Sequence, residues 1–158
     1  SVSQIKIPDK NLLTIFVNTK GKVYMTMDNK NTLGALADQM VADGKLPKLS
    51  DAEKKAFEQA PTFGTPLNMT KSWLDAPEEK RNDLLRDAQA GIPCDSVNDE
   101  LKVWVKAART VAGEEMLIAV KADQSTSYAV IKKVMDSLRS IEENRYNLIT
   151  ALKNASKD

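Results

Sequence analysis

Asp123 is the side chain whose position in the sequence most favours a chemical role. It follows the apolar run Met116–Val120 and precedes a segment of helical periodicity that begins at Tyr128. Open α/β sheets bind ligands where strands end, so Asp123 and Tyr128 are candidate ligand-binding residues. The structural alternative is that the Asp123 carboxylate accepts amide hydrogen bonds from residues 124–127, while the Tyr128 ring packs on the sheet. Because no second polar group at catalytic spacing accompanies Asp123, the pattern favours the structural alternative.

The sequence contains few patterns that indicate an enzyme. The chain contains no His, which excludes His-based triads, His metal sites and His pH switches. Its six Gly residues form no phosphate-binding motif. Acidic pairs such as Glu114-Glu115 are adjacent in sequence, and adjacent side chains diverge on a helix, so they make poor acid–base pairs. We expect no enzyme, no cofactor and no metal; a small hydrolase would need a second carboxylate or a Ser beside Asp123.

Length and charge bound the class of protein. The 158 residues are of one-domain size and can bury a core without disulfide or metal support. The net charge of +1 argues against nucleic acid as a partner. No apolar run reaches the roughly 20 residues that cross a bilayer. Cys94 is expected to be a small, partly buried thiol, and Trp73 and Trp104 to anchor the core, with partner contact as the alternative for both Trp residues.

The last third of the chain predicts a strand–helix–strand unit. Met116–Val120 is short, β-branched in part and followed by polar residues, which is typical of a buried strand. A helix follows from Tyr128, after hydroxyl residues that can cap it, and strand character returns over Tyr146–Leu152. A helical crossover lets the two strands run parallel. The helix is expected to bury the face formed by Tyr128, Val130, Ile131, Val134, Met135, Leu138 and Ile141.

The N-terminal part predicts a β-hairpin that is followed by helices. Leu12–Val17 and Val23–Met27 have strand character, and Gly21 between them suits a positive φ. The helices that follow are expected to begin at a cap on Thr32, at a capping box of Ser50 and Glu53, and at a cap on Asp75. A later helix, capped by Ser96 or Asn98, would bury Val97, Leu101, Trp104, Val105 and Ala108.

Together these elements predict an α+β fold with a mixed sheet of four or so strands. The helices around Val97 and after Tyr128 would lie on one face of the sheet. Residues 1–11 would form a linker, and residues 12–158 would form one domain. The helical insertion, residues 29–95, would pack against the edge of the sheet or its second face.

A string of residues in the C-terminal half resembles the ExbD/TolR family. Its pattern is a strand that ends in a basic residue, a small residue and Asp, then a Tyr, a helix similar to Lys-Val-Met-Asp, and a closing strand with a Leu. The matching residues are Ile118–Asp123, Tyr128, Val130–Asp136 and Asn147–Thr150. The Lys-Gly-Lys turn at 20–22 and the stretches 63–66 and 91–96 extend the resemblance, which is closest to Bacteroidetes-type ExbD proteins. Cys94 departs from the pattern, where a small aliphatic residue is expected.

The resemblance implies a periplasmic domain anchored at the bacterial inner membrane. ExbD-like proteins act as homodimers with ExbB and TonB, and couple the proton motive force to outer-membrane uptake; TolR serves the parallel Tol system. The proton-handling Asp of the family lies in a membrane helix that would precede this chain, so no residue here inherits that role. The alternative is a TolR-like domain that binds peptidoglycan or a peptide, which a polar pocket at Asp123 and Tyr128 would favour.

The closing strand is the predicted contact surface. Apolar groups occur on both of its faces, and a final strand often lies at a sheet edge, where unpaired backbone groups recruit another strand. For Leu148 the alternative is that it packs under the helix that begins at Tyr128. The candidate partner-binding residues are Tyr146, Leu148, Thr150, Asp123 and Tyr128.

Overall fold

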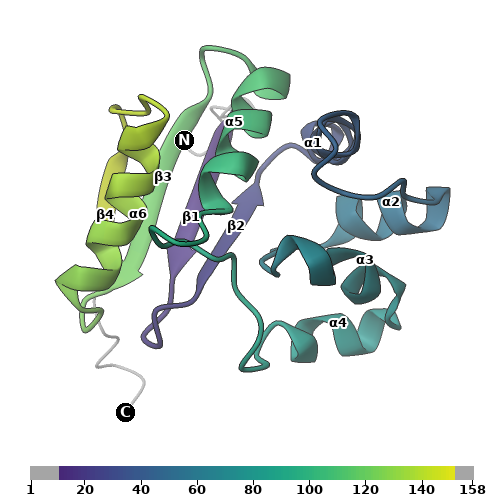
Figure 1. Ribbon diagram of the computed structural model, residues 1–158, viewed down its shortest axis with the longest axis horizontal. Coiled ribbons are helices and arrows are strands. Elements are labelled where there is room, and N and C mark those ends of the chain that lie inside the picture. The colour runs from purple at the N-terminus through teal and green to yellow at the C-terminus, as the bar shows by residue number, and fades with distance from the viewer. Residues whose placement is uncertain (1–10, 152–158) are drawn as a thin grey trace, which may run out of the picture.

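The computed structural model describes residues 11–151 as an α+β fold built on one four-stranded sheet (Figure 1). The strands are β1 (Leu12–Val17), β2 (Val23–Met27), β3 (Leu117–Asp123) and β4 (Asn147–Ala151). Their order across the sheet is β2-β1-β3-β4, with β1 and β2 antiparallel and the other two pairs parallel. The mixed sheet predicted from the sequence is therefore confirmed.

The parallel pair β1–β3 joins the first strand to a strand that lies about a hundred residues later in the chain. Leu13 lies opposite Ile118, and Val17 lies opposite Ala122. Asn11 extends this pairing, because its carbonyl accepts the Leu117 amide at 2.8 Å and its side-chain amide donates to Ala112, 101 residues away. Residues 1–10 of the predicted linker lie outside the described residues.

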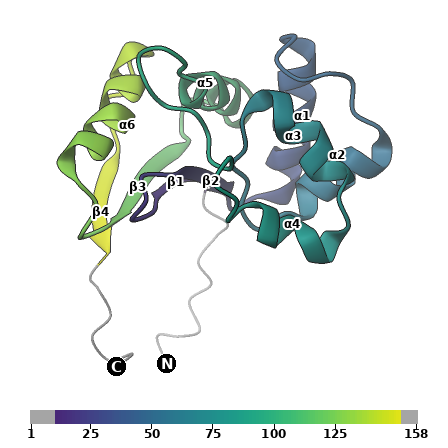
Figure 2. The same ribbon diagram turned by 60° about the horizontal axis from the view of Figure 1, so that its bottom comes forward.

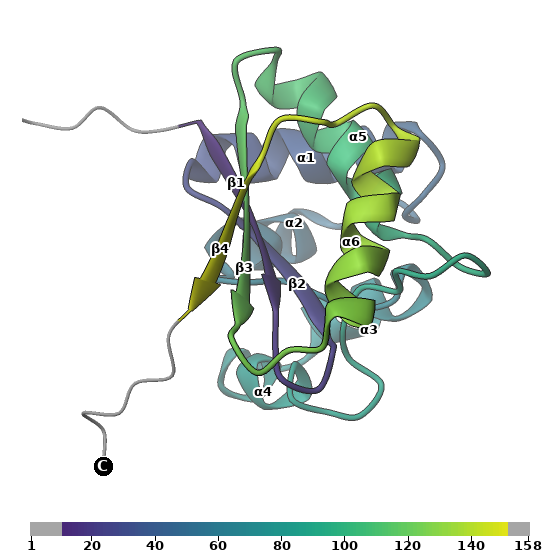
Figure 3. The same ribbon diagram turned by 90° about the vertical axis from the view of Figure 1, so that its left-hand side faces the viewer.

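Helices α5 (Leu101–Ala112) and α6 (Tyr128–Ser140) lie side by side on one face of the sheet (Figure 2, Figure 3). Alternate strand residues point toward them, so Leu13 and Ile15 are fully buried, as are Val134 and Leu138 of α6. Leu117 and Ile149 point to the opposite face and stay 60% and 43% exposed. No described helix covers that face of β3 and β4 in these views.

The predicted apolar face of α6 is wrong at its edges. Tyr128 is 68% exposed, and Met135 is only half-buried. At about 100° per residue, the buried residues Val134, Ser137 and Leu138 fix the centre of the buried face, and both Tyr128 and Met135 lie roughly 100° or more away from it. Ser137 instead occupies that face and is buried.

Val97 is also misplaced by the sequence pattern, because it lies in a loop and is 94% exposed. The Asp95 carboxylate accepts hydrogen bonds from the amides of Val97 and Asn98, at 2.9 and 2.8 Å, and thereby turns the chain before α5. Helix α5 begins only at Leu101, with Glu100 as its cap and no side-chain capping bond.

The insertion forms helices α1 (Lys30–Ala42), α2 (Asp51–Gln59), α3 (Leu67–Asp75) and α4 (Glu78–Leu84), which lie beyond the β2 edge (Figure 1). Its loops complete that edge. Met25 and Phe63 exchange two backbone hydrogen bonds, at 2.8 and 2.9 Å, and the Ile92 amide donates to Val23 at 2.8 Å. Within residues 11–151, no helix has the length and apolarity that crossing a membrane requires.

One continuous cluster of buried side chains runs from the sheet into the insertion. The rings of Phe57, Phe63 and Trp104 meet at its centre, with centroids 4.8–5.8 Å apart. Trp73 is buried as well, so both Trp residues anchor the core as expected. The insertion therefore shares the core of the sheet instead of forming a separate one.

Local capping signals were predicted with mixed success. The capping box of Ser50 and Glu53 is present. The cap of helix α1 is Asn29 and not Thr32. The Asn29 side chain accepts a hydrogen bond from the Asn31 amide. Helix α4 follows Pro77, which offers a fixed φ, so the cap expected on Asp75 is wrong.

Leu138→Ala tests the packing of α6 on the sheet. Leu138 is 0% exposed, so we expect the free energy of unfolding to fall by about 2–5 kcal/mol. Chemical denaturation of this variant and of Arg139→Ala, a neighbouring exposed position, provides the measurement. Equal stability of the two variants would contradict this placement of α6.

Candidate functional site

The structure places Asp123 in a turn that its carboxylate holds. One carboxylate oxygen accepts the Ser125 amide at 2.8 Å and the Ser125 hydroxyl at 2.6 Å, and the Asp123 carbonyl accepts the Thr126 amide. These bonds are those of the structural alternative. Tyr128 follows on the same turn, but its exposed ring does not pack on the sheet, so that expectation is wrong.

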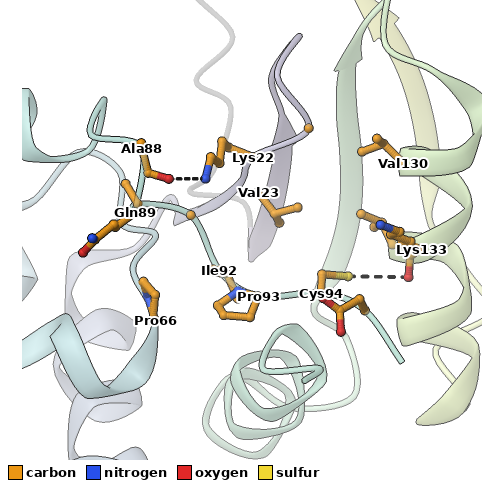
Figure 4. Close-up of a pocket in the computed structure, with 15 residues that line it drawn as sticks. Lys22, Val23, Pro66, Ala88, Gln89, Ile92, Pro93, Cys94, Val130 and Lys133 are labelled. Atoms are coloured by element: carbon orange, nitrogen blue, oxygen red, sulfur yellow. Dashed lines mark hydrogen bonds between the residues drawn. The ribbon is translucent and has the colours of Figure 1, made fainter. Parts of the chain in front are cut away.

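A hollow of about 340 Å³ lies instead between the insertion and α6 (Figure 4). We call it the seam hollow. Four separate stretches of the chain line it: the β1–β2 turn with Lys22 and Val23, Pro66 before α3, the end of the insertion at 88–95, and α6 with Val130 and Lys133. Asp123 and Tyr128 are not among its lining residues.

Backbone hydrogen bonds fix the walls of the seam hollow. The Asn18 side chain accepts the amides of Lys20 and Lys22, both at 2.9 Å, and Gly21 between them takes a φ of +80°. This geometry matches the turn predicted there. On the opposite wall, the Gly91 amide donates to the Gly64 carbonyl at 2.8 Å.

Gly91 lets the two walls approach closely. Its φ is +102°, and a Cβ on this residue would lie 3.1 Å from the Lys22 side chain. A larger residue would therefore strain the backbone and displace Lys22.

Charged groups surround the seam hollow unevenly. The Lys22 ammonium donates to the Ala88 carbonyl at 2.5 Å, and Lys133 lies on the α6 side (Figure 4). Asp95 is the one carboxylate that lines the hollow. Hydrogen bonds from the amides of Asn98 and Val97 lower the pKa of Asp95, and the charge of Lys133 lowers it further.

Cys94 lines the seam hollow as a protected thiol. Its sulfur donates to the Lys133 carbonyl at 3.5 Å. Burial, with a contribution from the nearby Asp99 charge, raises the pKa of the Cys94 thiol to about 12. The thiol is therefore protonated at neutral pH and is a poor nucleophile. The small, partly buried thiol expected from the sequence fits this environment.

A second, wider hollow of about 770 Å³ adjoins the first at Lys22 and Ala88. Its lining includes Lys20, Tyr24 and Arg86. The Tyr24 hydroxyl donates to the Leu85 carbonyl at 2.7 Å, and burial raises its pKa. Within the described residues, no cluster of His, Cys, Asp or Glu could hold a metal ion.

The predicted contact strand lies at the edge of the sheet, as β4. Its side chains are less buried than a core strand requires: Leu148 is 45% exposed, Thr150 is exposed and Tyr146 is half-buried just before the strand. Leu148 lies opposite Val120 and therefore points to the helical face, but α6 covers it only in part. Leu152 lies outside the described residues.

The five predicted site residues therefore fall into two groups. Asp123 and Tyr128 lie around the β3–α6 turn, and Tyr146, Leu148 and Thr150 lie on or beside β4. None of them lines the seam hollow or the wider hollow. The Lys-Gly-Lys turn at 20–22 was visible in the sequence, but nothing there showed that the end of the insertion would face it.

Comparisons with protein-family models, with curated proteins and with solved structures gave no match to this chain. The resemblance to the ExbD/TolR family therefore stays a prediction from the sequence.

The raised pKa of Cys94 predicts slow alkylation of the folded protein. At about pH 9 an ordinary thiol is roughly half ionised, whereas the Cys94 thiol of the folded protein stays protonated. Iodoacetamide should therefore react with Cys94 at least about a hundredfold more slowly in the folded protein than in the denatured chain. Mass spectrometry of the reaction over time, with and without guanidinium chloride, measures both rates. Similar rates in the two states would show an ionised, accessible thiol.

Proposed function

We propose that this chain is the periplasmic, non-enzymatic module of an ExbD-like energy-transduction complex, and that it dimerises through β4. The open edge of β4 is the observation that carries the proposal. β4 pairs only with β3 among the described strands. The residue string that resembles the ExbD/TolR family ends in this same strand.

The two edges of the sheet differ in a way that supports this use of β4. The β2 edge is occupied, because Met25 and Phe63 exchange hydrogen bonds and Ile92 donates to Val23. Proteins commonly protect an exposed strand edge with charges, Pro residues or a covering loop. The stretch Leu148–Ala151 contains no charged residue and no Pro. Such an edge is suited to pairing with another strand.

The partners follow from the resemblance. An ExbB-like protein would hold the complex in the inner membrane, and a TonB-like protein would receive the transmitted force at the periplasmic face. A membrane helix before this chain would supply the anchor and the proton-handling Asp. The chain itself would contribute dimerisation and partner contact.

The TolR-like alternative, binding of peptidoglycan or a peptide, depended on a polar pocket at Asp123 and Tyr128. Asp123 uses its carboxylate within the turn, and the two hollows described above are lined by neither residue. No observation at the predicted place favours this alternative.

Cross-linking through single cysteines tests dimerisation at β4. In a Cys94→Ala background, Asn147→Cys and Ile149→Cys should give dimers with a bifunctional maleimide, because paired edge strands bring these positions close together. Thr26→Cys, on the occupied β2 edge, is the matched control and should give few dimers. Dimer formation that is equal at both edges, or absent at β4 at high protein concentration, would contradict the proposal.

Leu148→Gln separates contact from stability. Leu148 is 45% exposed, so we expect a small change in melting temperature and a clear loss of the β4 cross-links. A large fall in melting temperature would show that Leu148 serves the core beneath α6 instead.

A further inference from the structure

Lys22 lines the seam hollow and carries its ammonium in a solvent-exposed hydrogen bond. Its ammonium donates to the Ala88 carbonyl, and it forms no ion pair within residues 11–151. An ammonium has three N–H donors, so at least one can serve a further acceptor. An ammonium without a carboxylate partner is available for a charge-assisted hydrogen bond to an anion beside it.

A second cation faces the same space from the other side, where the Asp95 charge interacts with it. Lys133 lines the seam hollow from α6 and also forms no ion pair among the described residues. Its neighbour Lys132 is different, because it pairs with Asp136 at 2.7 Å. Asp95 offsets part of this positive charge, but its carboxylate accepts two amides of its own loop.

Part of the seam hollow is apolar, and Gln89 and Asp95 add polar side chains to the same lining. Val23, Ile92, Pro93 and Val130 contribute to its lining between the two Lys residues (Figure 4). Ligand sites commonly combine such apolar walls with a few convergent polar groups. A volume of 340 Å³ corresponds to roughly ten non-hydrogen atoms at the packing of liquid water.

We propose that the seam hollow binds a small organic anion, with a carboxylate held by Lys22 and Lys133 and a short apolar body against the Val, Ile and Pro side chains. The wider hollow beyond Lys22 adds Lys20, Arg86 and Asp87, and Arg86 pairs with Asp83 at 2.8 Å. This site is independent of β4 and of the proposed dimer.

Nuclear magnetic resonance titration of the whole chain with three probes tests the sign of the charge and the need for an apolar body. Octanoate should shift the amide signals of residues 20–23, 88–95 and 130–134 in a saturable way. Acetate, which lacks the apolar body, should bind at least about ten times more weakly, because most of the buried apolar area is absent. Octylammonium, which has the opposite charge, should give no saturable shifts at these residues.

Charge-removing variants locate the anion. Lys22→Gln should weaken octanoate binding about tenfold or more, and Lys133→Gln should weaken it in the same direction, because each loses a charge-assisted contact. Lys48→Gln removes an exposed charge that lines neither hollow and should leave the affinity unchanged. An unchanged melting temperature in the Lys variants shows that the fold is intact.

Three results would overturn this site. They are equal binding of octanoate and octylammonium, affinity that is unchanged in both Lys22→Gln and Lys133→Gln, and octanoate shifts that map to β3 and β4 instead of to the seam hollow. Because the readout is ligand binding by residues far from β4, failure here leaves the dimer proposal intact, and the reverse also holds.

Discussion

The parallel pairing of β1 with β3 is the constraint on which the rest of the structure depends. It brings together segments that are about a hundred residues apart, as the bond from Asn11 to Ala112 shows directly. The entropic cost of closing a loop rises only slowly with loop length, so a long insertion is compatible with this pairing. The pairing of β1 with β3 requires only that the inserted chain starts at the end of β2 and ends at the start of α5.

Arg109 secures the point where the chain returns. Its guanidinium donates to the carbonyls of Gly113, Glu114 and Met116, between the end of α5 and the start of β3. It also pairs with Glu143 beyond α6, at 2.7 and 2.9 Å, and this hydrogen bonding raises the pKa of Arg109. One partly buried side chain therefore ties the end of α5, the start of β3 and the α6–β4 link together.

The sequence predicted the elements whose periodicity is local, and missed the features that depend on distant contacts. The strands and the Ser50 capping box depend on near neighbours, and they were found. Tyr128 and Val97 were assigned to buried faces because they are apolar near a helix start, but the helix phase set by Val134 and the Asp95 turn leave them exposed. The seam hollow could not be predicted, since its walls come from four segments that meet only in the folded chain.

The insertion explains why the molecule has one open edge and one hollow seam. By pairing Phe63 with Met25 and Ile92 with Val23, it completes the β2 edge with backbone bonds, and the hydroxyls of Tyr24 and Thr26 donate to carbonyls of the insertion as well. Those backbone bonds require extended backbone against β2. Helix α6, which lies on one face of the sheet, approaches the β1–β2 turn at Gly21. The seam hollow lies between these paired loops and α6. Gly21 and Gly91 line it and contribute no side chains that could fill it. The seam hollow therefore lies where the insertion that covers one edge meets α6, and Lys22 and Lys133 place their positive charges in its lining.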